Sequence, residues 1–542
     1  MQRILRATAA AMVTASLGLA ASTLNAQEIK QGGAMVVTYK DDISTFDPAI
    51  GYDWQNWSMI KSLFDGLMDY KPGTTELIPD LAESYTISDD GLTYTFKLRQ
   101  GVKFHNGRDL VASDVKYSIE RAVNPETQSP GQGFFWQIKG FEEMTSGGAT
   151  ELSGITTPDD HTVVIELSQP DATFLQIMAI NFAFAVPREA VEEHGQDFGR
   201  NPVGTGAYKM TEWTLGQRVV FERNADYFRE GSPYLDKITF EVGQEPTVAL
   251  LRLKRGEVDV LGDPIPSAQF LQEKNDPANK DLMVEGDLLH TGYITLNTTQ
   301  PPFDNKLVRQ AVNMAINKER VLRIVNNRGV AANQPLPPAM PGYDTAYSGY
   351  AYDPAKAKEL LAEAGYADGF ETELYAMNTD PNPRIAQSFQ QDLAAIGIKA
   401  EIKWLAQATV IDAGGQGTAP MLWSGGMAWI ADYPDPSNFY GPILGCGGAV
   451  PGGWNWAKYC NEELEELAAK ADGMAGADQA EERIDLWREI FVKIMDDAPW
   501  VPVFNEVRFA MHSARVAGDD IFFADPIHIP VHYEYVYATD AQ

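Results

Sequence analysis

The chain of 542 residues has little of what catalytic sites are usually built from. It contains no His-Glu-x-x-His, no Gly-x-Ser-x-Gly and no phosphate-binding loop ending in Gly-Lys-Ser/Thr. Its seven histidines are scattered, and the pair at helical spacing, His528 and His532, stands beside Pro526 and Pro530, which oppose a helix. We therefore predict no metal site and no enzymatic activity.

Support for a cofactor is also lacking. Gly414, Gly415 and Gly417 do not follow a strand and open a helix as a dinucleotide site requires, so a surface loop is expected there and no cofactor is predicted. A secreted hydrolase remains as a weaker alternative, because a glycosidase pair cannot be excluded by counting among 75 acidic residues.

Positive charge is scarce. Lys and Arg number 43 against 75 Asp and Glu, which gives a net charge of −32. Such a surface repels nucleic acid and anionic membranes, so neither is predicted as a partner. With 11 Trp and 22 Tyr the chain is too aromatic for a disordered acidic protein, and its length predicts two or three domains.

Long apolar runs are missing outside the N-terminus. There, Arg3 and Arg6 precede an Ala-rich apolar run from Ala7 to Ala21, and polar residues follow Ala26. This order is typical of a secretory signal peptide, here residues 1–26, cleaved after Ala26. No cysteine follows the run to carry a lipid anchor, and no other stretch is long enough to span a bilayer. The mature protein is expected to be soluble and exported.

Cysteine is nearly absent, since only Cys446 and Cys460 are present. An oxidising compartment favours a disulfide between them, and a zinc site is the alternative. No histidine lies between or near them, which disfavours zinc. Closing so short a loop would stabilise the folded state by about 3 kcal/mol, which is enough to fix the loop but not to stabilise the whole fold.

One apolar stretch ends abruptly in a carboxylate. Met421-Leu-Trp423, and Met427-Ala-Trp-Ile430 after a Ser-Gly-Gly break, lead to Asp432, after which Pro434 and Pro436 block further strand pairing. The pattern predicts a buried strand that delivers the Asp432 carboxylate to its exposed end. The alternative is that Asp432 caps a turn before Pro434.

Several motifs follow one another in a fixed order. Pro79-Asp-Leu-Ala-Glu-Ser-Tyr-Thr-Ile-Ser-Asp-Asp-Gly91 precedes an alternating strand over 93–98 and an amphipathic helix over 112–121. Asn201-Pro-Val-Gly-Thr-Gly-Ala-Tyr208 and a block over 302–316 come next, and Asp353 and Pro354 then begin a helix that ends at Gly365. In this order the motifs resemble the family 5 extracytoplasmic solute-binding proteins, the periplasmic receptors for di- and oligopeptides in ABC importers.

The resemblance implies an α/β periplasmic-binding-protein fold with two lobes on a hinge and a ligand cleft between them. The first lobe would be discontinuous and comprise residues 27–66, 203–288 and 501–542. An extra domain would cover 67–202, and the second lobe would cover 289–500. The implied function is that of a monomeric receptor which captures small peptides and delivers them to an ABC permease in the inner membrane.

The family's cleft strand ends in Trp-x-x-Asp, which Trp429-Ile-Ala-Asp432 matches. The resemblance implies that Asp432 binds the α-ammonium of the ligand and that Ala428 and Ile430 pair with its backbone. Trp429 and Tyr433 are the neighbouring candidate ligand-binding residues.

The opposite wall of the family's site is the loop after Asp-Pro, which here is Tyr52, Asp53 and Trp54. In the dipeptide-binding branch a cysteine pair also sits shortly after the aspartate motif. The resemblance therefore places the expected disulfide between Cys446 and Cys460 near the cleft.

The sequence departs from the family at the ligand carboxylate. Dipeptide receptors grip it with an arginine in the segment that here is Leu374-Tyr-Ala-Met-Asn-Thr-Asp380, which has none. The oligopeptide branch can use an arginine six residues before the aspartate, where Gly426 stands, and Arg384 is interpreted as structural. Recognition of an ammonium is better supported than recognition of a carboxylate. The alternative to a peptide ligand is another amine-bearing or cationic solute.

Overall fold

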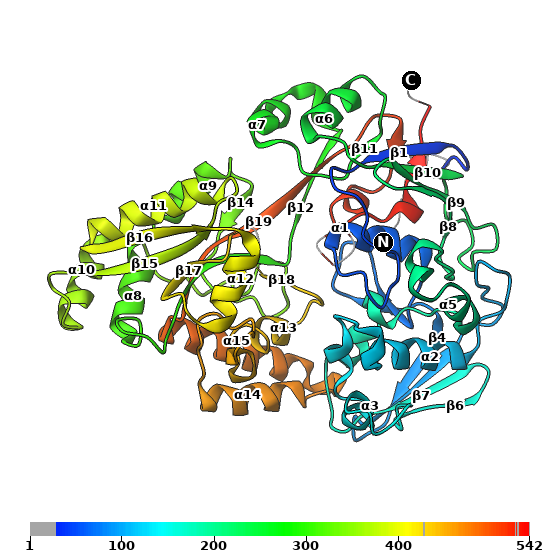
Figure 1. Cartoon of the computed structure of the whole chain (residues 1–542), viewed down its shortest axis with the longest axis horizontal. Helices are drawn as coiled ribbons and strands as arrows, with labels where there is room; N and C mark the ends of the chain where they lie inside the picture. Colours follow the sequence, from blue (N-terminus) through cyan, green and yellow to red (C-terminus); the bar gives the residue numbers. More distant parts are fainter. Residues whose placement is uncertain (1–28, 426–428, 526, 528–529, 541–542) are drawn as a thin grey trace, which may run out of the picture.

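The computed structural model of the chain describes residues 29–425, 429–525, 527 and 530–540. The expected signal peptide, residues 1–26, lies outside this part. The described chain has an α/β fold and forms two bodies side by side, with β12 (Met283–Asp287) and β19 (Trp500–Met511) running between them (Figure 1).

One body, which we call the first lobe, is built on a five-stranded sheet in the order β11-β1-β10-β9-β8. Pairing is parallel on both sides of β1 and antiparallel beyond β10. The strands are β1 (Ala34–Thr38), β8 (Tyr208–Thr214), β9 (Arg218–Arg223), β10 (Lys237–Glu241) and β11 (Val260–Leu261). Its helices are α1 (Trp54–Leu63), α6 (Pro246–Lys254) and α7 (Ser267–Asn275).

Below the first lobe in Figure 1 lies an extra domain on a four-stranded antiparallel sheet, in the order β4-β5-β7-β6. In β5 the side chains of Tyr94, Phe96 and Leu98 are buried, and those between them are not, which confirms the predicted alternating strand. The strands are β4 (Ala82–Ile87), β5 (Thr93–Leu98), β6 (Ile155–Asp159) and β7 (Thr162–Glu166). The helices are α2 (Ala112–Val123), α3 (Phe141–Thr145), α4 (Phe174–Ile177) and α5 (Arg188–His194), and β2 (Met68–Tyr70) pairs with β3 (Leu77–Pro79) nearby.

The other body, the second lobe, is built on an eight-stranded sheet. Its order is β12-β19-β13-β17-β15-β16, with β14 on β19 and β18 on β13. The further strands are β13 (His290–Leu296), β14 (Gly329–Ala331), β15 (Phe370–Met377), β16 (Ile398–Leu405), β17 (Met421–Trp423) and β18 (Trp429–Ile430). The helices are α8 (Lys306–Ala315), α9 (Lys318–Ile324), α10 (Pro354–Glu363), α11 (Asn382–Ala395), α12 (Gln407–Gln416), α13 (Pro436–Tyr440), α14 (Glu462–Asp472) and α15 (Ala480–Asp497).

The twelve residues of β19 belong to both bodies. The strand pairs with β13 over its first half and with β12 over its second half. Val501 and Val503 lie in the core of the second lobe, whereas Ala510 packs into the core of the first. After β19, the chain adds a short ribbon of β20 (Val516–Ala517) and β21 (Tyr537–Ala538), and Tyr533 joins the first-lobe core.

Two predictions about helices have different outcomes. The helix predicted at Asp353 is confirmed, because its carboxylate accepts the Lys356 amide at 2.9 Å and Pro354 is the first helical residue. The surface loop expected at Gly414 and Gly415 is wrong, because both are buried in α12. A Cβ on Gly414 would lie 2.6 Å from the Trp456 ring, so glycine is required there by close packing rather than by a turn.

Of the two histidines at helical spacing in the sequence, His528 lies outside the described residues. His532 is buried and lies 3.1 Å from Asp525 and 3.5 Å from Glu534. In the part of the chain that the structure describes, no group of three His, Cys, Asp or Glu side chains could hold a metal ion.

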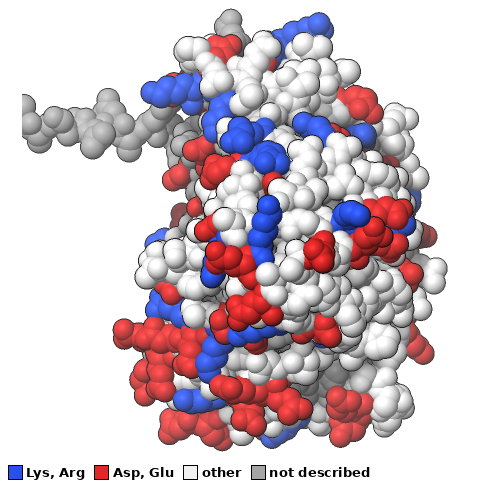
Figure 2. Space-filling view, turned by 90° about the vertical axis from the view of Figure 1, so that its left-hand side faces the viewer, with Lys and Arg blue, Asp and Glu red and all other residues white. Residues whose placement is uncertain are grey.

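The face of the molecule on the side of the second lobe carries charge of both signs. Figure 2 shows acidic side chains gathered towards the lower edge of this face and many basic ones in its upper half. Of the helices within the described ranges, none is long and apolar enough to cross a membrane. The domain boundaries at residues 66, 202, 288 and 500 stay a prediction.

Candidate ligand-binding site

Asp432 lies in the turn between β18 and α13. β18 pairs antiparallel with Thr291 and His290 of β13, and the Ala431 amide then donates to the Leu289 carbonyl at 2.9 Å. β17 and β18 are separate short strands rather than one run. Asp432 is only 6% exposed. The expected exposed strand end is therefore wrong, because other parts of the chain cover the carboxylate.

Both carboxylate oxygens of Asp432 are held by neutral donors. Oδ1 accepts the Tyr52 hydroxyl at 2.5 Å, and Oδ2 accepts the Asn438 side-chain amide at 3.1 Å. Asn438 Oδ1 in turn accepts the Asp432 amide at 3.1 Å and the Trp429 indole N–H at 2.9 Å. One asparagine on α13 thus fixes both ends of the Trp429-Ile-Ala-Asp432 motif.

The Asp432 carboxylate lacks a matching charge in the described part of the chain. Burial raises the pKa of Asp432, and the hydrogen bonds from Tyr52 and Asn438 oppose this shift. No described Lys, Arg or His side chain forms an ion pair with it. Buried carboxylates in proteins are normally paired with a cation or a metal, so this arrangement suits a cationic group of a ligand.

Tyr52 reaches Asp432 from the first lobe, just before α1. The residue is 41% exposed, and its ring lies 5.3 Å from the Phe182 ring and 6.0 Å from the Trp57 ring, measured between centroids. Burial of the hydroxyl and the adjacent Asp432 charge raise the pKa of Tyr52, so the phenol stays protonated and acts as a donor. The contact joins residues 380 positions apart and connects the two lobes.

The other residues expected on this wall behave differently. The Asp53 carboxylate accepts the Ser44 hydroxyl at 2.8 Å and stands at the N-cap of α1, so it serves its own lobe. Trp54 is the first residue of α1, and its side chain is not among those described. Ala428, which was expected to pair with the ligand from the cleft strand, lies outside the described residues.

The aromatic neighbours of Asp432 in the chain pack against further aromatic rings. The Trp429 ring lies 6.2 Å from that of Trp454, which is 44% exposed and stacks on Trp456 at 5.7 Å. The Tyr433 ring lies 6.4 Å from that of Phe134, which belongs to the extra domain. Sequence reasoning missed Trp454 and Phe134, although the aromatic content of the disulfide loop was a usable signal for the former.

A capping role, which was the alternative expected for Asp432, is found instead at Asp435. Asp435 accepts the Ser437 amide at 2.9 Å at the start of α13. It also forms a two-pronged ion pair with buried Arg483, at 2.7 and 2.8 Å. Burial would raise the pKa of Asp435, but Arg483 lowers it below its ordinary value. Of the two carboxylates in Asp432-Tyr-Pro-Asp435, the second is paired with Arg483, whereas the first has no cationic partner among the described residues.

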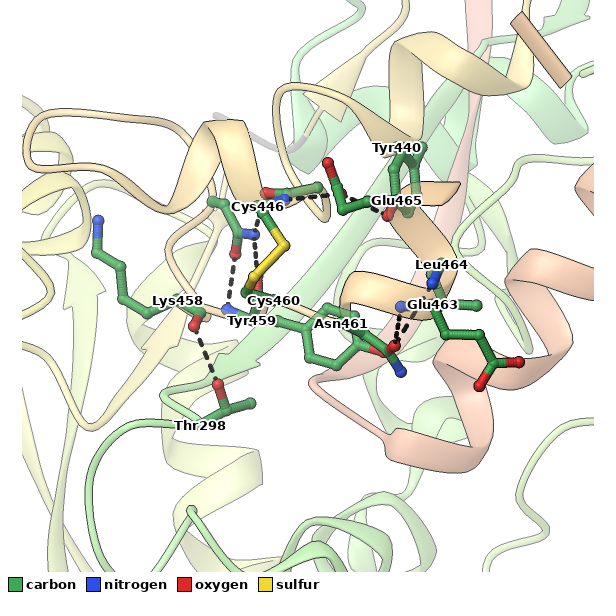
Figure 3. The surroundings of a disulfide bond; sticks show 12 residues. Thr298, Tyr440, Cys446, Lys458, Tyr459, Cys460, Asn461, Glu463, Leu464 and Glu465 are labelled. Atoms are coloured by element: carbon green, nitrogen blue, oxygen red, sulfur yellow. Dashed lines mark hydrogen bonds between the residues drawn. A yellow bond between two sulfur atoms is a disulfide. The ribbon is translucent and has the colours of Figure 1, made fainter. Parts of the chain in front are cut away.

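Cys446 and Cys460 are joined by a disulfide with an Sγ–Sγ distance of 2.04 Å (Figure 3). The Cys446 amide and the Tyr440 hydroxyl both donate to one oxygen of Glu465, at 2.9 and 2.6 Å. The closed loop contains Trp454, whose ring faces Trp429. The disulfide therefore lies in the loop that carries one aromatic wall of the candidate site.

Arg384 does not reach this site in the described structure. It pairs with Asp380 at 2.9 and 3.0 Å on the exposed start of α11, in agreement with its interpretation as structural.

Two α/β lobes on shared strands, with a candidate site formed where they meet, define a two-lobed solute-binding protein. The bacterial extracellular solute-binding proteins, family 5 Middle, match residues 76–450 of this chain. The chain belongs to this family.

Three similar proteins illustrate the range of the family. The heme-binding protein A of Haemophilus influenzae is 33% identical over 495 residues, which are 87% of this chain and 87% of that protein. The glutathione-binding protein of Salmonella typhi is 33% identical over 518 residues, which are 93% of this chain and 95% of that protein. A Helicobacter pylori ABC transporter-associated periplasmic binding protein, solved with the peptide STSA, is 28% identical with a TM-score of 0.76, covering 94% of this chain and 98% of that one.

Proposed function

We propose that this protein is the receptor of an ABC importer, which captures small peptides in the cleft between its lobes and delivers them to a permease in the inner membrane. The supporting observation is the buried Asp432 carboxylate, which has two neutral donors and no cationic partner in the described residues. A peptide α-ammonium would supply that charge through a charge-assisted hydrogen bond.

The edge of β18 supports an extended ligand. In the described residues Trp429 and Ile430 pair with β13 alone, so one side of this strand is open for a further strand. A peptide lying there would exchange main-chain hydrogen bonds with β18 and bring its first residue to Asp432. Trp429, Tyr433 and Tyr52 would then surround the ammonium end.

The Tyr52 contact indicates how closure depends on the ligand. Tyr52 belongs to the first lobe and Asp432 to the second, so a ligand bound between them contacts both sides and favours the closed state. We propose that the first lobe comprises 27–66, 203–288 and 501–542, the extra domain 67–202 and the second lobe 289–500. Movement would occur where β12 and β19 cross between the lobes.

We further propose that residues 1–26 are removed on export and that the mature protein acts as a periplasmic monomer which releases its ligand unchanged. Support comes from the extracellular description of the family and from relatives that are named for what they bind.

The alternative function is a receptor for a non-peptide amine or another cationic solute. It is favoured by the same carboxylate and by the lack of an arginine in residues 374–380. The relatives named above bind ligands as different as glutathione and heme, so the ligand must be identified by measurement.

Calorimetric titration of the exported protein with di- and tripeptides, their N-acetylated forms and simple amines tests the proposal. We expect a free peptide to bind and N-acetylation to weaken binding by about a hundredfold or more, because the acetylated end carries no charge. Equal binding of both forms would contradict the role of Asp432. Tighter binding of a simple amine than of every peptide would favour the alternative.

A further inference from the structure

A cavity of about 170 Å³ lies beside the candidate site, where the two lobes meet. Cavities of about 150 Å³ are known to hold a benzene molecule, so this one has room for a small functional group. Its walls include Trp57 of α1, Ile430 of β18 and part of β19. Ile430 stands two residues before Asp432, so the cavity adjoins the segment that carries that carboxylate.

The position of the cavity suits a side group of the ligand rather than its chain end. Strand side chains project out of the plane in which main chains pair. A peptide paired with the edge of β18 lies in that plane, whereas the cavity lined by Ile430 lies to its side. A branch on the first or second residue of the ligand would therefore enter it.

Arg328 gives the cavity a positive charge that the described residues do not pair. One of its nitrogens donates to the Ile265 carbonyl, and its guanidinium lies 3.9 Å from the centre of the Phe270 ring. Among the described residues Arg328 forms no ion pair, and its buried Nε has no hydrogen-bond acceptor. Arg508 of β19 lines the same cavity. Two guanidinium groups thus border a space next to Asp432.

Two acids, Asp263 and Glu506, line the same cavity. The Asp263 carboxylate accepts the Lys40 amide at 2.6 Å, and burial raises the pKa of Asp263 to about 6. Burial raises the pKa of Glu506 as well, and the charges of Arg328 and Arg508 only partly oppose this shift, so the protonated, neutral form of Glu506 is favoured. Neither acid forms an ion pair with Arg328 in the described structure. An incoming carboxylate would be the natural partner of this arginine.

We propose that this cavity is a second subsite, in which Arg328 and Arg508 bind a carboxylate on the first residue of a ligand whose ammonium lies on Asp432. The inference rests on the proposed function and narrows the ligand to a class. The class is small peptides whose N-terminal residue carries both an ammonium and a free carboxylate. Two sources share this chemistry: α-linked peptides that begin with glutamate, and γ-glutamyl peptides.

Titrations with Glu-Gly, γ-Glu-Gly and the neutral Gln-Gly test the subsite. The native protein should bind at least one of the acidic peptides about tenfold or more tightly than Gln-Gly, and the tighter of the two identifies the source. Arg328→Gln should weaken binding of that peptide by about tenfold to a hundredfold and leave Gln-Gly nearly unchanged. Arg508→Gln should act in the same direction, and Arg328→Lys should keep part of the preference because it keeps the charge.

Arg384→Gln is the matched control, since this arginine is exposed and paired with Asp380 outside the cavity. It should change none of the three affinities. Melting curves of every variant show whether a loss of affinity reflects unfolding. Arg328→Lys keeps the positive charge and therefore separates the effect of the charge from that of the guanidinium shape.

Three outcomes would overturn the inference. Equal native affinity for the three peptides would remove the acidic preference. If Arg328→Gln weakens binding of all three peptides equally, and this loss of affinity disappears when their C-termini are amidated, Arg328 binds the C-terminal carboxylate of the ligand instead. Absence of binding of any peptide to the folded native protein would overturn the proposed function together with this subsite, whereas peptide binding without an acidic preference overturns the subsite alone.

Discussion

Replacing Asp432 by asparagine removes a single charge and keeps the shape of the side chain. In the ligand-bound state the carboxylate would form a charge-assisted hydrogen bond with the ammonium, worth roughly 1.5 to 3 kcal/mol. Asp432→Asn leaves the ammonium buried without a counter-charge, and that loss can reach roughly 3 to 5 kcal/mol. Affinity should therefore fall by about two to three orders of magnitude.

Stability without ligand should change little. The substitution removes a buried charge, which is favourable, and it turns one acceptor towards Tyr52 or Asn438 into an amide donor, which is unfavourable. Because these effects oppose each other, we expect a net change of about 1 kcal/mol or less, or less than about 4 °C in melting temperature.

The neighbouring aspartate provides the control. Asp435→Asn breaks the buried pair with Arg483 and should destabilise the protein by roughly 3 to 5 kcal/mol, while the folded variant binds nearly normally. Calorimetric titration of both variants measures the loss of affinity, and their ligand-free melting curves measure the loss of stability. Unchanged affinity in Asp432→Asn, or a loss of the same size in folded Asp435→Asn, would refute the reasoning.

Four further predictions concern Tyr52, the pH dependence of binding, the disulfide and His532. Tyr52→Phe should weaken binding by about threefold to tenfold through loss of one hydrogen bond, and titration that shows no change would place Tyr52 outside the site. Binding of an ammonium ligand should be lost as pH falls through the raised pKa of Asp432, since the protonated carboxyl has no charge, and Asp432→Asn should lack this pH dependence. Thiol titration of the unfolded, unreduced protein should find no free Cys446 or Cys460, and two thiols after reduction; two before it would exclude the disulfide. Burial lowers the pKa of His532, but its two acidic neighbours outweigh this effect and raise the pKa to about 10. The stabilisation from protonated His532 should therefore be complete below pH 6.5 and disappear as the pH rises towards 10. A melting temperature that falls equally over this pH range in His532→Asn would contradict this prediction.

Local patterns in the sequence predicted the elements that depend on nearby residues. The strand over 93–98 follows from alternation, and the helix at Pro354 follows from its cap and its first-position proline. The helix containing Gly414 could not be predicted in this way, because glycine has low helix propensity and its presence is explained by a tryptophan 42 positions later in the chain.

The candidate site was only partly accessible to the same reasoning. The motif pointed to Asp432, but its carboxylate accepts a hydrogen bond from Tyr52, which is 380 residues away, and no local pattern encodes such a contact. Asn438 was also missed, although it lies six residues from Asp432 and links its carboxylate to the Trp429 indole. The arginines of the neighbouring cavity come from β19 and from the segment before β14, so only the folded chain brings them together.

The late position of β19 has a consequence for how the protein is made. The strand lies between β12 and β13 in the second-lobe sheet, and Tyr533 fills part of the first-lobe core. Until residues 500–533 have been synthesised and translocated, the second-lobe sheet lacks the strand that joins β12 to β13, and the core of the first lobe is incomplete. We expect the nascent chain to stay extended enough to thread through an export channel, and to fold in one late step once its C-terminal segment arrives on the far side.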